Sequence, residues 1–131
     1  PEGAPYYPPE YYTDQEPTFR VTEIVREKAM ALAREELPHA ILVMVQDSEM
    51  GEIDPETGQP SSLFLRIAIF VERESQKGIL VGRGGRNIGR IREAAHGEIA
   101  ELFDYPVRME LRVKVKPKWR NDDALLESLF E

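Results

Sequence analysis

The stretch VGRGGRNIGRI, residues 81–91, places four glycines and three arginines among eleven positions. Glycine adopts left-handed backbone conformations without steric cost, and it lets another backbone approach where a Cβ would block it. Helix-forming sequence lies on both sides, because Ser75 to Val81 is a short helical candidate and Arg86 to Phe103 carries an apolar stripe at helical spacing. The sequence therefore predicts a helix, a glycine loop over residues 82–85 and a second helix.

Two kinds of nucleotide-binding loop do not fit this stretch. Gly84 to Gly89 has the two-glycine spacing of a P-loop, but the next residues are Arg90 and Ile91. A P-loop needs a lysine there to reach the outer phosphates and a hydroxyl residue to hold magnesium, and isoleucine cannot ligate a metal ion. The dinucleotide fingerprint also fails, because Asn87 takes the place of its third glycine.

Three further segments predict strands. Ile41 to Gln46 and Leu63 to Glu72 are apolar runs with β-branched residues, and turn residues between them predict a long hairpin loop over 48–62. Val107 to Lys116 alternates apolar and polar side chains, as a half-buried strand does. The first two strands are expected to pair antiparallel. The third follows a helical crossover and is expected to run parallel to its partner.

The expected fold is α+β, with a three-stranded mixed sheet covered on one face by helices, in the order helix–strand–strand–helix–helix–strand. Pro17 to Leu37 supplies the first helix. Residues 1–16, rich in proline and tyrosine, read as a linker or extended arm, 17–120 as the folded domain, and 121–131 as a tail with a short helix.

Charge is distributed unevenly along this acidic chain, whose formal net charge is −7. Residues 1–75 hold 6 basic and 15 acidic side chains, residues 76–120 hold 11 basic and 5 acidic, and residues 121–131 hold 4 acidic, which gives −9, +6 and −4. Screening confines such fields to about 8–10 Å at physiological salt. A polyanion is therefore expected to approach the segment that contains the glycine loop.

The glycine loop and its neighbours form a pattern that suits a nucleic acid backbone. The helix that follows presents unpaired amides and the positive end of its dipole to a phosphate. Glycines at the loop permit close approach, arginines add charge, and neighbouring aliphatic residues offer a floor for bases. The predicted site consists of Gly82, Arg83, Gly84, Gly85, Arg86, Ile79, Val81 and Ile88. This G-x-x-G clamp between helices is typical of the KH module, which binds single-stranded nucleic acid.

Three longer stretches resemble the C-terminal KH domain of the bacterial Era GTPases. They are FVERESQKGILVGRGGRNIGRIREAA (70–95), VKVKPKWR (113–120) and TEIVREKAMALAREELPHAI (22–41), and the opening PEGAPYYP resembles the linker between the two domains of that family. Position 83 is arginine where the family often has lysine, and the loop over 48–62 is longer and more acidic than usual.

The resemblance implies a type II KH fold that binds the 3′ end of small-subunit ribosomal RNA during assembly of the small ribosomal subunit. It also implies a GTPase domain in the parent protein, and nothing in this chain resembles that domain. Catalysis by this chain is therefore not expected. The family resemblance, and nothing in the composition, implies a peripheral association with the inner membrane. Otherwise the chain is expected to be cytoplasmic, since it lacks cysteine and any signal peptide or membrane-spanning run.

Other polar groups carry weaker signals. His39 and His96 lack metal-site spacing, so no metal or other cofactor is expected. Arg108, Arg112, Lys114 and Lys116 form a basic row that is expected on the sheet face away from the loop, either as a solvated surface or as a secondary phosphate contact. The alternative function is a protein-interaction module that docks through the acidic surface or the long hairpin loop.

Overall fold

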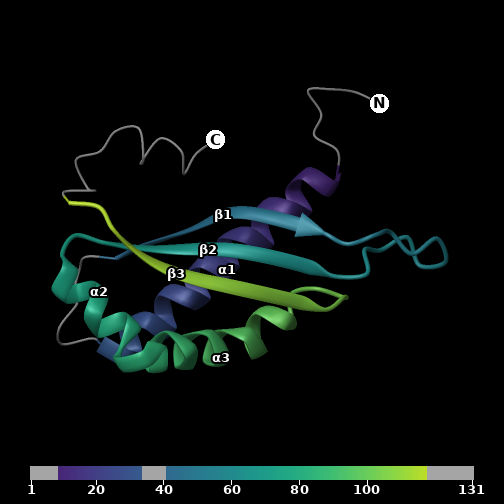
Figure 1. Cartoon of the computed structure of the whole chain (residues 1–131). Helices are drawn as coiled ribbons and strands as arrows, with labels where there is room; N and C mark the ends of the chain where they lie inside the picture. Colours follow the sequence, from purple (N-terminus) through teal and green to yellow (C-terminus); the bar gives the residue numbers. More distant parts are fainter. Residues whose placement is uncertain (1–8, 34–40, 118–131) are drawn as a thin grey trace.

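The computed structural model describes residues 9–33 and 41–117 (Figure 1). The elements follow the expected order along the chain. They are the helix α1 (Pro9–Ala33), the strands β1 (Leu42–Met50) and β2 (Leu63–Val71), the helix α2 (Glu74–Val81), a 3-10 turn (Arg83–Gly85), the helix α3 (Arg86–Ala100) and the strand β3 (Val107–Val115). The predicted C-terminal helix within 121–131 lies outside the described residues, as does the segment 1–8.

The first helix begins earlier than the sequence predicts. It starts at Pro9, with Pro17 inside it, so that half of the predicted extended arm is helical. Proline suits the first turn of a helix, and in a helix interior it removes one hydrogen bond and bends the chain. The prediction used Pro17 as the starting residue, whereas Pro9 takes that place. The composition of residues 9–16 was therefore a misleading guide to their backbone.

The sheet has the predicted mixed topology, with strand order β1-β2-β3. The strands β1 and β2 pair antiparallel, with Leu42 opposite Phe70 and Met50 opposite Leu63, and a bulge lies between Val45 and Asp47. The strands β2 and β3 pair parallel, from Leu63 opposite Val107 to Val71 opposite Val115. Consequently β1 and β3 are both edge strands, each with one side of its backbone unpaired within the sheet.

All three helices lie on one face of the sheet (Figure 1), as the sequence predicts. Side chains at odd positions of β2 and β3 point into the core between sheet and helices, and Ile67 and Ile69 are fully buried there. The apolar stripe of α3 packs on the same core. At the far end of α3, His96 Nε2 lies 2.8 Å from the carbonyl oxygen of Val107 and ties the helix to the start of β3.

The hairpin between β1 and β2 is more ordered than a long loop. The strand β1 continues to Met50, Gly51 N–H donates to the Ser62 carbonyl at 2.9 Å, and Ile53 bridges to Pro60. Asp54 then starts a tight turn that closes at Gly58, which has a φ of 76°. The predicted loop over 48–62 therefore shortens to a turn at the tip of an extended hairpin.

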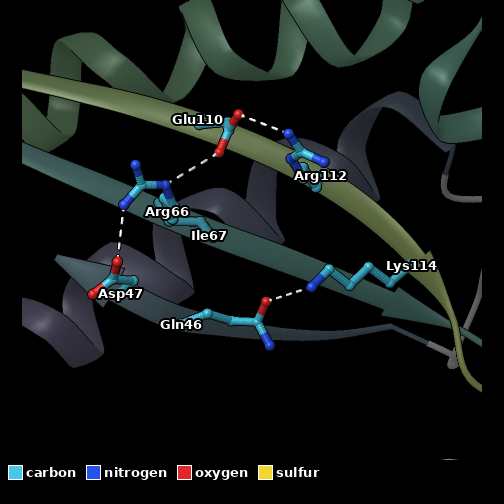
Figure 2. Close-up of a pocket in the computed structure, with 7 residues that line it drawn as sticks. All are labelled: Gln46, Asp47, Arg66, Ile67, Glu110, Arg112 and Lys114. Atoms are coloured by element: carbon cyan, nitrogen blue, oxygen red, sulfur yellow. Dashed lines mark hydrogen bonds and ion pairs between the residues drawn. The ribbon is translucent and has the colours of Figure 1, made fainter.

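The sheet face away from the helices carries a polar network (Figure 2). Arg66 lies between Asp47 at 2.8 Å and Glu110 at 3.7 Å, and Arg112 contacts Glu110 at 3.2 Å. Lys114 donates to Gln46 at 2.7 Å. The even positions of β3 thus face away from the core, as the alternation of the sequence predicts.

Candidate nucleic-acid interface

The glycine loop connects α2 to α3 through three residues with positive φ. Gly82 has a φ of 74° and a ψ of 171°, Gly84 a φ of 63°, and Gly85 a φ of 80°. Residues with a Cβ rarely adopt these conformations, and the combination at Gly82 is almost confined to glycine. The loop turns on itself, since Gly85 N–H donates to the Gly82 carbonyl at 3.1 Å.

The helix α3 begins directly after this loop. Gly85 is the N-cap residue, and among the described residues no side-chain cap accepts a hydrogen bond from the start of α3. Such amides, together with the positive end of the helix dipole, attract an anion. A Cβ added at Gly84 would meet no atom within 4 Å, so the loop surface is open. The backbone therefore presents donors at a place that a phosphate can reach.

The loop arginines differ from Arg66 of the sheet. Arg83 and Arg86 are exposed, and no carboxylate in the described ranges forms an ion pair with either of them. In contrast, Arg66 contacts Asp47, Glu49 and Glu110 on the sheet. Two unneutralised cations thus flank the open loop, and their charge adds to that of the helix end.

A groove of about 630 Å³ is lined by residues of α2, α3 and β3, including Val81 and Ile88 on either side of the loop. Aliphatic side chains form much of its surface and charged groups lie along it. The lining residues are Glu74, Lys77, Val81, Ile88, Leu111, Arg112, Val113, Lys114 and Val115. Since β3 is an edge strand, its unpaired backbone groups also face this side. The groove offers an apolar surface for bases and polar groups that can hydrogen-bond to their edges.

The structure places the eight predicted site residues in three groups. Gly82, Arg83, Gly84, Gly85 and Arg86 form the loop and the start of α3. Val81 and Ile88 line the groove. Ile79 is half-buried and packs against the main core, and it is not among the groove residues.

Sequence reasoning missed the contribution of β3. The basic row lies on the sheet face away from the helices, as predicted, with Arg112 bonded to Glu110 and Lys114 to Gln46. The same two residues also line the groove at the edge of the sheet, which the sequence did not indicate. Side chains at the edge of a sheet can reach either face, because no neighbouring strand flanks them. The predicted topology could have indicated this role of β3, since a third strand that pairs with one partner has a free edge.

Other functional sites are not found in the part of the chain that the structure describes. Among those residues no group of three or more histidines and acidic residues is placed to hold a metal ion. No helix of the described ranges is long and apolar enough to cross a membrane. His39, which the sequence analysis considered with His96, lies outside the described residues.

A helix–glycine loop–helix beside the free edge of a mixed sheet is the arrangement of a nucleic-acid-binding module. Residues 36–120 match the KH domain family, and the chain belongs to that family. As a KH domain, the chain itself is not an enzyme. Its fold is of type II, and the chain is similar over its length to the C-terminal KH domain of Era.

Two relatives show the extent of this similarity. GTPase Era of Borreliella burgdorferi strain ZS7 is 45% identical over 129 residues, which cover 98% of this chain and 42% of the relative. GTPase Era of Treponema pallidum strain Nichols is 45% identical over 130 residues, covering 99% of this chain and 39% of the relative. The chain therefore spans about two fifths of the length of the proteins that it matches.

Solved structures of Era are also similar to this chain. A crystal structure of Era in complex with MgGDPNP and nucleotides 1506–1542 of 16S ribosomal RNA aligns with a TM-score of 0.72 and 34% sequence identity, covering 97% of this chain and 40% of that chain. A crystal structure of Aquifex aeolicus Era bound to GDP·AlF4− aligns with a TM-score of 0.71 and the same identity and coverage.

Proposed function

We propose that this chain binds single-stranded RNA, with phosphates at the glycine loop and bases in the adjoining groove. The observation that carries the proposal is the junction of an open loop, an uncapped helix N-terminus and an apolar groove along a free strand edge. Each part suits a different portion of a nucleotide. Phosphate needs amides and cations, whereas an unstacked base needs an apolar surface and hydrogen-bonding groups at its edge.

The loop supplies the phosphate contacts in this proposal. The amides of Gly85 and Arg86 bond to carbonyls of the loop itself, so the phosphate contacts fall to the amide of Gly84 and the first amides of α3 beyond Arg86. Arg83 and Arg86 add charge without a competing carboxylate in the described structure. The absence of side chains at Gly84 and Gly85 lets the RNA backbone approach. This contact is independent of base identity, so it fixes position and supplies affinity.

The groove supplies the base contacts. Val81 and Ile88 lie next to the loop, and half-buried Val115 extends the apolar surface along β3, while Leu111 and Val113 touch the groove from the core. Lys77 lies on the α2 side of the groove and adds a positive charge. The free edge of β3 provides backbone donors and acceptors for base edges. A duplex already uses these base edges for pairing, so the groove favours single strands.

We assign the 3′ end of small-subunit ribosomal RNA as the target, and the small ribosomal subunit as the larger partner. Support comes from the similar Era structure, which contains nucleotides 1506–1542 of 16S ribosomal RNA. We also assign this chain the role of the RNA-binding part of an Era-like GTPase, since its relatives carry that name and are more than twice as long. Nucleotide hydrolysis then belongs to the remainder of such a protein.

The first prediction tests the clamp with the variant Arg83→Asp/Gly84→Asp. Aspartate is one of the few side chains that tolerate left-handed backbone, and Gly84 is open, so the fold should be retained. The variant places anions where phosphates bind. We expect the affinity for a single-stranded oligonucleotide of the ribosomal 3′ end to fall by more than about 10-fold, with a shallower dependence of log K on log salt. Fluorescence anisotropy at several salt concentrations measures both.

The matched control is Phe19→Asp/Arg20→Asp, which changes the net charge by the same three units. Both residues are exposed on α1, which contributes no residue to the groove. The control should bind RNA nearly as the original chain does. An equal loss of affinity in both variants would mean that total charge governs binding, and it would count against a clamp. Failure of the original chain to bind any single-stranded RNA would overturn the proposed function itself.

A further inference from the structure

A hydrogen bond crosses the glycine loop from one helix to the other. The side-chain amide of Asn87, in the first turn of α3, donates through Nδ2 to the carbonyl oxygen of Ile79 at 2.8 Å. Ile79 lies in the last turn of α2, where carbonyls lack donors from their own helix. Gly82 N–H already bonds the Gly78 carbonyl at 2.8 Å. The Asn87 amide therefore satisfies a carbonyl that the end of α2 would otherwise leave without a partner.

The same side chain occupies the space beside Gly82. A Cβ built on Gly82 would lie 2.7 Å from Asn87 Cγ and 2.8 Å from Nδ2. In contrast, a Cβ on Gly84 would meet nothing within 4 Å, and one on Gly85 would have ordinary contact with Ile88 at 3.8 Å. Of the three loop glycines, only Gly82 is thus in tight contact with the Asn87 side chain. The hydrogen bond and this contact together fix the angle between the end of α2 and the start of α3.

We infer that Asn87 is a positioning residue that holds the glycine loop in its binding geometry before RNA arrives. This inference rests on the proposed function. One N–H of the Asn87 side-chain amide donates to a protein carbonyl, so this hydrogen bond acts within the fold. Three glycines with positive φ have much conformational freedom to lose when a ligand orders them. A bond across the loop lowers that loss, because the loop is already held in place.

The experiment compares the original chain with Asn87→Ala. Alanine is the strongest helix former, so α3 keeps its propensity while the bond to Ile79 is lost. Two quantities are measured: affinity for the single-stranded oligonucleotide at several salt concentrations, and hydrogen exchange of the Gly84 and Gly85 amides without RNA. We expect roughly 3- to 10-fold weaker binding, faster exchange at the loop, and an unchanged salt slope, because no phosphate contact is removed.

The control variant is Glu93→Ala, an exposed position two turns further along α3. It should leave the exchange of the loop amides unchanged. If Asn87→Ala speeds loop exchange but binds RNA as the original chain does, Asn87 supports only the fold and the inference is wrong. Weaker RNA binding by Asn87→Ala with unchanged loop exchange would also overturn it, because Asn87 would then contact RNA itself. Both outcomes presuppose that the original chain binds RNA, so they are distinguishable from failure of the proposed function.

Discussion

Gly82 and Gly84 both have positive φ, yet their surroundings differ. The backbone of Gly82 lies in a region almost confined to glycine, and Asn87 occupies the space of its absent side chain. Gly84 has a left-handed helical conformation and open surroundings. We therefore expect Gly82→Ala to lower the free energy of unfolding by about 2–3 kcal/mol and Gly84→Ala by about 1 kcal/mol. Urea unfolding at neutral pH measures the difference.

A double-variant cycle separates the two causes at Gly82. In the background of Asn87→Ala the collision with the amide disappears, whereas the backbone strain of Gly82→Ala remains. The cost of Gly82→Ala should therefore be smaller in that background than in the original chain. Equal costs in the two backgrounds would show that the Asn87 side chain moves aside freely, and that the strain is entirely in the backbone.

Some features of this site could be predicted from the sequence, and others could not. The glycines, arginines and aliphatic neighbours of the loop were predictable, because their chemistry is local and the spacing is compact. The bond from Asn87 to Ile79 was not, since it joins two helices whose relative angle the sequence does not state. The exclusion of Ile79 from the groove has the same origin. Leu80 and Val81 are adjacent in α2 but face different directions, since Leu80 is fully buried and Val81 lines the groove.

The helices and strands were predicted well where apolar residues recur at a regular interval along the sequence. The start of β2, the start of α3 and the span of β3 agree closely with expectation, because each has a run of apolar residues at a regular interval. The end of α3 was placed at Phe103 and lies at Ala100. At the hairpin, β1 continues through Gln46 into polar residues up to Met50. Pairing with β2 maintains the strand there, and such a cross-strand effect leaves no periodic signal.

An ion pair between α1 and α3 predicts an alkaline effect on stability. Lys28 Nζ donates a hydrogen bond to Glu98, which is the main reason that the pKa of Lys28 is raised; burial lowers it in part, and the charge of Glu27 raises it further. A raised folded-state pKa gives stability that is fully present below the unfolded pKa and is lost as pH rises through the folded value.

Lys28→Met should therefore reduce the alkaline loss of stability. Below about pH 9 the stability difference between the original chain and the variant should be constant and small, because the pair is partly exposed. Above the ordinary lysine pKa of about 10.4 that difference should shrink. Urea midpoints from pH 7 to 12 measure it, with Lys77→Met as a lysine control that has no ion pair among the described residues. Parallel curves for the original chain and Lys28→Met would contradict this assignment.

Across the whole molecule, the tip of the acidic hairpin and the helix α2, which lines part of the groove, lie at different ends of the sheet (Figure 1). The hairpin joins β2 where Leu63 pairs with Val107, whereas the groove residues of β3 pair with the other half of β2. Leu111, the groove residue of β3 nearest the hairpin, pairs with Ile67, and at about 3.3 Å per residue the four steps from Leu63 to Ile67 span roughly 13 Å. This exceeds the Debye length of about 8 Å at physiological salt. The carboxylates at the hairpin tip are thus screened from the groove, whereas Glu74 lies in its lining.

This separation allows the effect of acidic residues on RNA affinity to be compared at the hairpin tip and at the groove. Glu52→Gln/Glu56→Gln removes two charges at the exposed hairpin tip, and Glu74→Gln removes one at the groove. At physiological salt we expect the tip variant to bind RNA within about twofold of the original chain, and Glu74→Gln to bind about 2- to 5-fold more tightly. At 0.01 M salt, where the Debye length is about 30 Å, the tip variant should also gain affinity. A larger gain from the tip than from Glu74 at physiological salt would place the RNA along the hairpin, and a groove-bound strand could not explain it.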